Sequence, residues 1–214
     1  MAKPTKTAPK KDKDLCRIIT PEFRVSYPHV FKPQAPKPTD TPKFSITMLF
    51  RKDQSLEGMS PDGKPRSLKD VIKQAKIAEF GPKENWPDNL ESPVVDGDDP
   101  KFADKDGYKG HWVIKATTSQ DQRPSVVGPD MTPITEPSVL YPGCYARAYI
   151  YGYVWYYPDR QKPMKIGVGF ILDHVQKLRD GKPFGGKRPV EQVFSPVSVP
   201  DTDGDDDEED HDFR

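Results

Sequence analysis

Residues 145–157 read YARAYIYGYVWYY, and this stretch decides how the rest of the chain is interpreted. Successive side chains of a β-strand point to opposite faces, so the even positions form a small apolar face and the odd positions an aromatic face. Aromatic rings beside a cation suit single-stranded nucleic acid, because every base has a π-face and every phosphate a charge. The same rings also suit a hydrophobic core, so the stretch alone leaves a binding surface and a core layer open. The odd positions are Tyr145, Arg147, Tyr149, Tyr151, Tyr153, Trp155 and Tyr157.

The loop at 158–164 and the strand predicted at 165–172 favour the binding surface. If even positions of the two strands pair with even positions, the apolar faces combine into a core. The aromatic rings then lie over Gly167 and Gly169, exposed beside Lys165. The opposite register would bury the tyrosines and leave a face of Ala, Gly and Val with no evident role. We therefore predict the register that exposes the aromatic face.

Charge is distributed unevenly along the 214 residues, although the formal net charge is zero. Residues 201–214 hold nine of the 33 Asp and Glu and one of the 33 Lys and Arg, so residues 1–200 carry 32 bases against 24 acids, a net +8. A basic body with an acidic tail indicates an anionic partner for the body, and a competitor or a separate partner for the tail.

Composition favours one domain with flexible ends over two small domains, because 25 prolines and 31% charged residues leave little chain for a second core. We predict a disordered basic arm at 1–14, a folded domain at 15–194 and a disordered acidic tail at 195–214. The N-terminus has no signal-peptide pattern and no 18-residue apolar run occurs, so we expect a soluble, cytoplasmic protein. Cys16 and Cys144 show neither zinc-site nor disulfide-framework spacing.

Alternating patterns predict further strands, and one segment predicts a helix. Ser67 and Asp70 form a capping box, and Gly81 followed by proline stops the helix. Of the strands, the first is expected to end at Pro28 with Tyr27 on the face of its apolar residues, and the third carries Trp112 and Lys115 on opposite faces. This order predicts a mainly β, OB-fold-like barrel of five to six strands with one helix and disordered termini. The predicted strands lie within 18–31 and at 43–50, 111–118, 123–127, 145–157 and 165–172; residues 173–189 are expected to form a polar turn or short helix.

Enzymatic alternatives have weak support in the sequence. A calcium site in the acidic segment 96–106 fails the EF-hand spacing. A metal-dependent nuclease that uses these acids is the best catalytic alternative. The four histidines are scattered, and no phosphate loop or nucleophile motif occurs. We therefore expect no enzymatic activity and no cofactor.

Four blocks, in this order, resemble one known family: GYKGHWVIKATT, RPSVV, LYPGCYARAYIYGYVW and IGVGFILDHVQKLRDGKPFGG. The family is that of phage single-stranded DNA-binding proteins, once catalogued only as a domain of unknown function. The resemblance covers roughly residues 17–194. It implies an OB-fold that binds single-stranded DNA without strong sequence preference during phage replication or recombination, in the host cytoplasm. The helix departs from the common OB order, because it precedes the third strand instead of following it.

The candidate site residues form two groups, one in the acidic tail for partner proteins and one in the folded domain for DNA. The acidic tail resembles tails that recruit replication partners, which implies partner binding by Phe213, Asp210 and Asp212, although Arg214 follows the aromatic residue here. An RNA-binding or duplex-architectural module stays open, since stacking is indifferent to the 2′-hydroxyl. The predicted DNA-binding residues are Tyr149, Tyr151, Tyr153, Trp155, Arg147, Trp112, Lys115 and Lys165.

Overall fold

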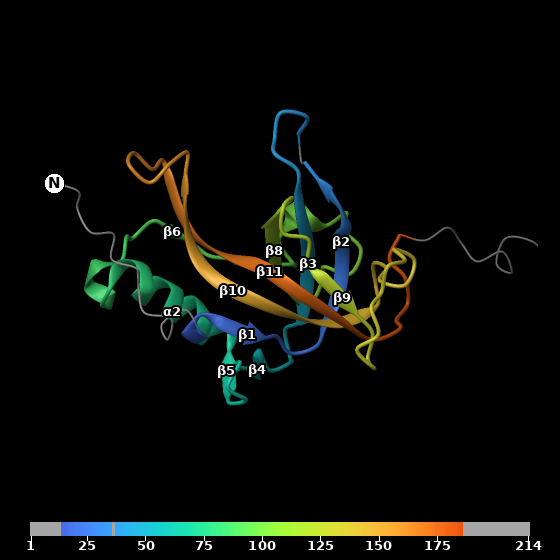
Figure 1. The fold of residues 1–214 in the computed structure, drawn as a ribbon. Helices are drawn as coiled ribbons and strands as arrows, with labels where there is room; N and C mark the ends of the chain where they lie inside the picture. Colours follow the sequence, from blue (N-terminus) through green and yellow to red (C-terminus); the bar gives the residue numbers. More distant parts are fainter. Residues whose placement is uncertain (1–13, 36, 186–214) are drawn as a thin grey trace, which may run out of the picture.

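Five long strands form a ring in the computed structural model, which describes residues 14–35 and 37–185 (Figure 1). Neighbouring strands pair antiparallel throughout the ring except for β8 and β11, which run parallel. The fold is therefore mainly β and OB-like, as predicted, with short strands added at the edges of the ring. In ring order the strands are β2 (Phe23–Gln34), β3 (Lys43–Arg51), β8 (His111–Ser119), β11 (Lys165–Arg179) and β10 (Tyr145–Tyr157), which returns to β2.

The remaining elements are one helix and several short strands and turns that are not part of the ring. β1 pairs with β10, β9 with β11, and β6 and β7 fill the space where β8 and β11 diverge. They are β1 (Arg17–Ile19), β4 (Glu57–Met59), β5 (Pro65–Ser67), α2 (Leu68–Phe80), β6 (Leu90–Glu91), β7 (Val94–Asp96), β9 (Ser125–Val127) and the 3-10 turns Lys83–Asn85 and Pro100–Phe102.

The pairing of β10 with β11 has the predicted register. Trp155 is opposite Gly167, Tyr153 is opposite Gly169, and the even positions of the two strands face each other likewise. At Tyr149 the register shifts, because Asp173 forms a bulge and His174 becomes the partner of Tyr149. The odd face of β10 consequently lies on the outside of the ring.

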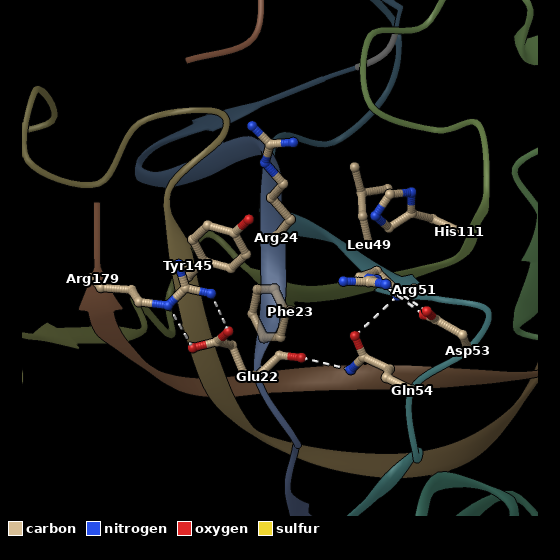
Figure 2. A pocket seen from close by; sticks show the side chains of 10 residues that line it. All are labelled: Glu22, Phe23, Arg24, Leu49, Arg51, Asp53, Gln54, His111, Tyr145 and Arg179. Atoms are coloured by element: carbon tan, nitrogen blue, oxygen red, sulfur yellow. Dashed lines mark hydrogen bonds and ion pairs between the residues drawn. The ribbon is translucent and has the colours of Figure 1, made fainter. Parts of the chain in front are cut away.

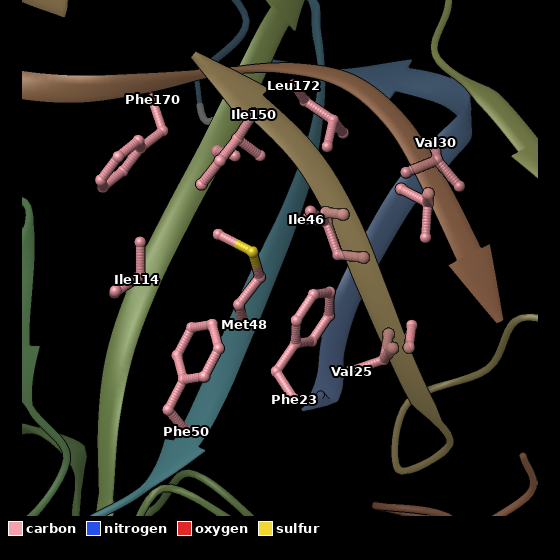
Figure 3. Close-up of a cluster of buried hydrophobic side chains, with 14 of the residues drawn as sticks. Phe23, Val25, Val30, Ile46, Met48, Phe50, Ile114, Ile150, Phe170 and Leu172 are labelled. Atoms are coloured by element: carbon pink, nitrogen blue, oxygen red, sulfur yellow. The ribbon is translucent and has the colours of Figure 1, made fainter. Parts of the chain in front are cut away.

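The even face of β10 contributes to a core that receives side chains from every strand of the ring (Figure 3). Ala146 and Ala148 contribute small, buried side chains to it. Phe23 and Phe50 meet edge to face, with ring centroids 5.6 Å apart. Fully buried members include Phe23, Val25, Ile46, Met48, Phe50, Ile114, Ile150, Phe170 and Leu172.

Helix α2 begins at the predicted capping box. The Asp70 amide donates to Ser67 Oγ at 3.1 Å, and the Ser67 amide donates to the Asp70 carboxylate at 3.2 Å. The helix packs against β10 at Gly152, where a Cβ would lie 2.9 Å from Val71 Cγ1. The absence of a side chain at Gly152 thus lets the helix approach the strand closely.

The structure corrects three local predictions. The first ring strand does not end at Pro28 but runs on to Gln34. Tyr27 leaves the apolar face because its backbone turns to φ +44°, and its side chain is 46% exposed. The last strand continues to Arg179 where a turn or helix was expected, because the Asp173 bulge shifts the alternation by one residue, so that Val175 and not His174 points into the core. The arm at 1–13 and the segment 186–214 lie outside the described residues, so the predicted domain limits stay predictions.

Candidate nucleic-acid interface

The outer face of β10 carries an aromatic row, defined here as Tyr149, Tyr151, Tyr153 and Trp155. A Cβ on Gly167 would lie 2.4 Å from Trp155 Cζ2, and one on Gly169 would lie 3.2 Å from Tyr153 Cε1. The two rings therefore rest on the backbone of β11, which only glycine leaves bare. All four rings are half-buried and not fully exposed, because the neighbouring strands cover part of each.

Cationic and aromatic groups flank the other end of the row. The Arg17 guanidinium carbon lies 5.5 Å from the ring centroid of Tyr149 and 5.2 Å from that of Tyr151, and it forms an ion pair with Asp173. Tyr149 also stacks on His174, with centroids 6.0 Å apart and planes 6° apart. Arg17 and His174 were missed in the sequence because one lies on a three-residue strand and the other in the segment expected to be a turn.

The predicted cations are distributed around this outer surface. Arg147 is exposed and donates from Nε to Gln176 Oε1 at 2.8 Å. Lys165 lies 3.3 Å from a Glu91 carboxylate oxygen. Lys115 is exposed on β8, whose outer face adjoins that of β11 because Thr117 is paired with Ile171.

Lys115 also lines a hollow of about 440 Å³ beneath the loop that joins β2 and β3. Lys43 and the hydroxyl groups of Ser45 and Thr117 line it as well. Together these groups extend the polar surface from β11 across β8 to β3.

Trp112 lies apart from the aromatic row. It is on the same face of β8 as Ile114 and Ala116, it packs against the core, and Lys52 Nζ lies 4.8 Å from its ring centroid. The structure therefore does not bring Trp112 together with the other predicted site residues.

Burial favours the neutral form of two phenols of the row, those of Tyr151 and Tyr153. Burial raises the pKa of Tyr153, and burial is also the main cause of the raised pKa of Tyr151. A neutral phenol can lie beside a phosphate without like-charge repulsion, so these two rings suit a polyanionic ligand.

A second, arginine-lined cavity of about 610 Å³ lies where β10 begins and β11 ends (Figure 2). Tyr145 is flanked there by Arg179, whose guanidinium carbon is 3.5 Å from the ring centroid, and by Arg24 at 5.7 Å. Glu22 accepts hydrogen bonds from Arg179, while Arg24 donates to the carbonyls of Gly143 and Lys182. Much of the positive charge in this cavity is thus already engaged within the protein.

In the acidic segment considered for a nuclease, two aspartates form ion pairs with the same lysine. Lys52 Nζ pairs with both Asp96 and Asp98, and the Gly110 amide donates to Asp98 Oδ1 at 2.7 Å. Within residues 14–35 and 37–185, no three His, Cys, Asp or Glu side chains are placed to hold a metal ion. None of the helices in the same ranges is long and apolar enough to cross a membrane.

An OB-like ring with aromatic rings and cations on one outer surface has the architecture of an oligonucleotide-binding protein. The family model described as the ssDNA-binding protein of Enterobacter phage Enc34 matches residues 16–211. The chain belongs to this family, which confirms the resemblance seen in the sequence and places it among binding proteins, not enzymes. No curated protein matches the chain.

Solved structures of phage single-stranded DNA-binding proteins are among those similar to this chain. The single-stranded DNA-binding protein from bacteriophage Enc34 in complex with ssDNA is 24% identical, with a TM-score of 0.57 over 79% of this chain and 88% of that chain. A second structure of the Enc34 protein is also 24% identical, with a TM-score of 0.53 over 82% and 87%. The single-stranded DNA-binding protein gp2.5 of bacteriophage T7 is 11% identical, with a TM-score of 0.49 over 86% and 97%.

Proposed function

We propose that this protein binds single-stranded DNA along the outer face of β10, without strong sequence preference, and protects it during phage replication or recombination. The aromatic row supported on the glycines of β11 carries the proposal. Family membership supports the class of ligand, because the family is named for single-stranded DNA binding.

In the proposed complex, bases stack on Tyr149, Tyr151, Tyr153 and Trp155. Stacking contributes about 1 to 3 kcal/mol per base and tolerates any sequence, since every base offers a π-face. Arg147, Lys115 and Lys165 lie around the row and bind phosphates. Arg17, which already lies over two rings of the row, adds a further cation.

A competition titration tests the proposal directly. The full-length chain is titrated with a labelled single strand and challenged with unlabelled single-stranded DNA, duplex DNA and RNA of equal length. We expect single-stranded DNA to compete best. Equal or better competition by RNA or duplex would instead identify an RNA-binding or duplex-architectural module.

The salt dependence of the same titration measures the phosphate contacts. For single strands, log affinity falls against log salt with a slope of about −0.7 per neutralised phosphate. We expect a negative slope of several such units, and a flat response would contradict the electrostatic part of the proposal.

The acidic tail has its own proposed role, although it lies outside the described residues. Phe213, with Asp210 and Asp212 beside it, is the apolar anchor in an acidic run that a replication or recombination protein would recognise. We propose that DNA binding and partner recruitment both take place in the host cytoplasm, where phage DNA is copied.

A further inference from the structure

A hollow of about 420 Å³ opens beside the aromatic row, at the end nearer Arg147. Its volume falls in the range of about 300 to 1,000 Å³ that is typical of small-molecule sites. Four neighbouring strands, β1, β10, β11 and β9, each contribute one residue to the base of the hollow. These residues form a cross-strand row, because Ile19 pairs with Tyr149, Tyr149 with His174, and His174 with Ser125. Val127 of β9 adds a further apolar side chain. The hollow is thus a mainly apolar recess that shares Tyr149 with the row.

Met131 lies at the rim of this recess in a strained conformation. Its φ is +66°, in the left-handed region that residues other than glycine rarely adopt, and its side chain is 66% exposed. The turn that holds it is closed by a 2.8 Å hydrogen bond from the Gly128 amide to the Thr132 carbonyl. Such strain costs stability and is found at ligand clamps. The Met131 amide also donates to the Gly128 carbonyl at 3.1 Å, so the turn fixes the backbone while most of the side chain faces solvent.

Gln176 connects Met131 to the proposed DNA surface. Its Nε2 donates to the Gly128 carbonyl at 3.0 Å and lies 3.5 Å from Met131 Sδ, while its Oε1 accepts from Arg147 Nε. One side chain therefore fixes the turn, the methionine and the arginine relative to one another. In the described part of the chain, the Arg147 guanidinium has no carboxylate partner.

We propose that this recess binds one nucleobase of the single strand, held between Met131 and the pair formed by Tyr149 and His174. The inference rests on the proposed function, because the strand must already follow the aromatic row that begins at Tyr149. Arg147 at the rim is placed to bind the phosphate of the inserted nucleotide. The amide of Gln176 is engaged within the protein, so the base is recognised by its flat apolar faces and not by its hydrogen-bonding edge. Methionine adapts to surfaces of different shape, which suits any of the four bases.

The variant Met131→Gly tests the recess without harm to the fold. Glycine adopts positive φ freely, so the variant should unfold at the same temperature as the wild type or at a higher one. Affinity is measured for an oligo-dT and for an abasic oligomer of the same length, which offers phosphates but no bases. We expect Met131→Gly to bind oligo-dT about 5-fold more weakly, which corresponds to about 1 kcal/mol, and the abasic oligomer as tightly as the wild type does.

Two further variants serve as controls. Ile77→Ala removes an apolar side chain that is 37% exposed on α2, away from the recess, and should leave both affinities unchanged. Arg147→Ala removes a phosphate contact and should weaken both. The nucleobase site would be wrong if Met131→Gly bound oligo-dT as tightly as the wild type does, or if it lost the same affinity for oligo-dT and for the abasic oligomer. In either case the proposal that the wild type binds single strands would still hold. Failure of the wild type to bind oligo-dT would overturn the proposed function and the nucleobase site together.

Discussion

Trp155 is the residue on which the binding surface depends most, because its ring lies against the backbone of Gly167 and its position is therefore fixed before DNA arrives. A Trp155→Ala variant that stays folded should bind single strands about 5- to 150-fold more weakly, the equivalent of about 1 to 3 kcal/mol of stacking. Affinity is measured by titration, and Trp155→Phe, which keeps an aromatic face, should retain most of it. Normal affinity in a stable Trp155→Ala protein would remove this residue from the site, whereas loss of folding would assign it to the core.

At the scale of elements, a hydrogen bond and an ion pair to Glu79 connect the hairpin of β10 and β11 to α2. The Tyr156 hydroxyl donates to Glu79 Oε1 at 2.7 Å, and Arg160 pairs with the same carboxylate. Burial, together with this hydrogen bond, raises the pKa of Tyr156 to about 12. The ordinary value is 10.0, so between pH 10 and 12 the unfolded chain loses this proton while the folded chain keeps it. The free energy of unfolding should therefore fall over this range, and denaturant titrations should show a smaller fall in Tyr156→Phe. An equal fall in the free energy of unfolding of both proteins would contradict a stabilising hydrogen bond between Tyr156 and Glu79.

The elements also show what the sequence could and could not predict. Strict alternation identified the ring strands, and two glycines facing a row of large rings determined the register of β10 and β11. The strands β1, β6 and β7 have two or three residues, too few for a period. The strand β9 was predicted at 123–127, but its pairing with β11 was not. The bulge at Asp173 interrupts the alternation, so the second half of β11 and His174 within it were not recognised. Met131 could not be assigned either, because its position depends on a turn that only the folded chain forms.

At the scale of the whole molecule, the acidic tail is expected to compete with DNA for the basic body of the protein. Deletion of residues 201–214 should tighten DNA binding, most clearly at low salt, because screening weakens the competition as salt rises. The same deletion should abolish recruitment of a replication partner. Phe213→Ala keeps the charges, so it should leave DNA affinity unchanged and lose only the partner. A truncated protein that bound DNA no better than the full chain across a salt series would show that the tail is only a tether or a solubilising segment.

Because the ring closes, strands from the beginning of the described chain pair with strands from its end, which affects folding during synthesis on the ribosome. β1 and β2 pair with β10, which begins only at Tyr145, and β8 pairs with β11, which ends at Arg179. The N-terminal strands therefore emerge long before their partners have been translated, and such non-local pairing forms slowly. Until then β2 presents an open edge, which is prone to aggregation. Nascent chains that stall before Arg179 should consequently be degraded or aggregate, and should not accumulate as stable half-rings.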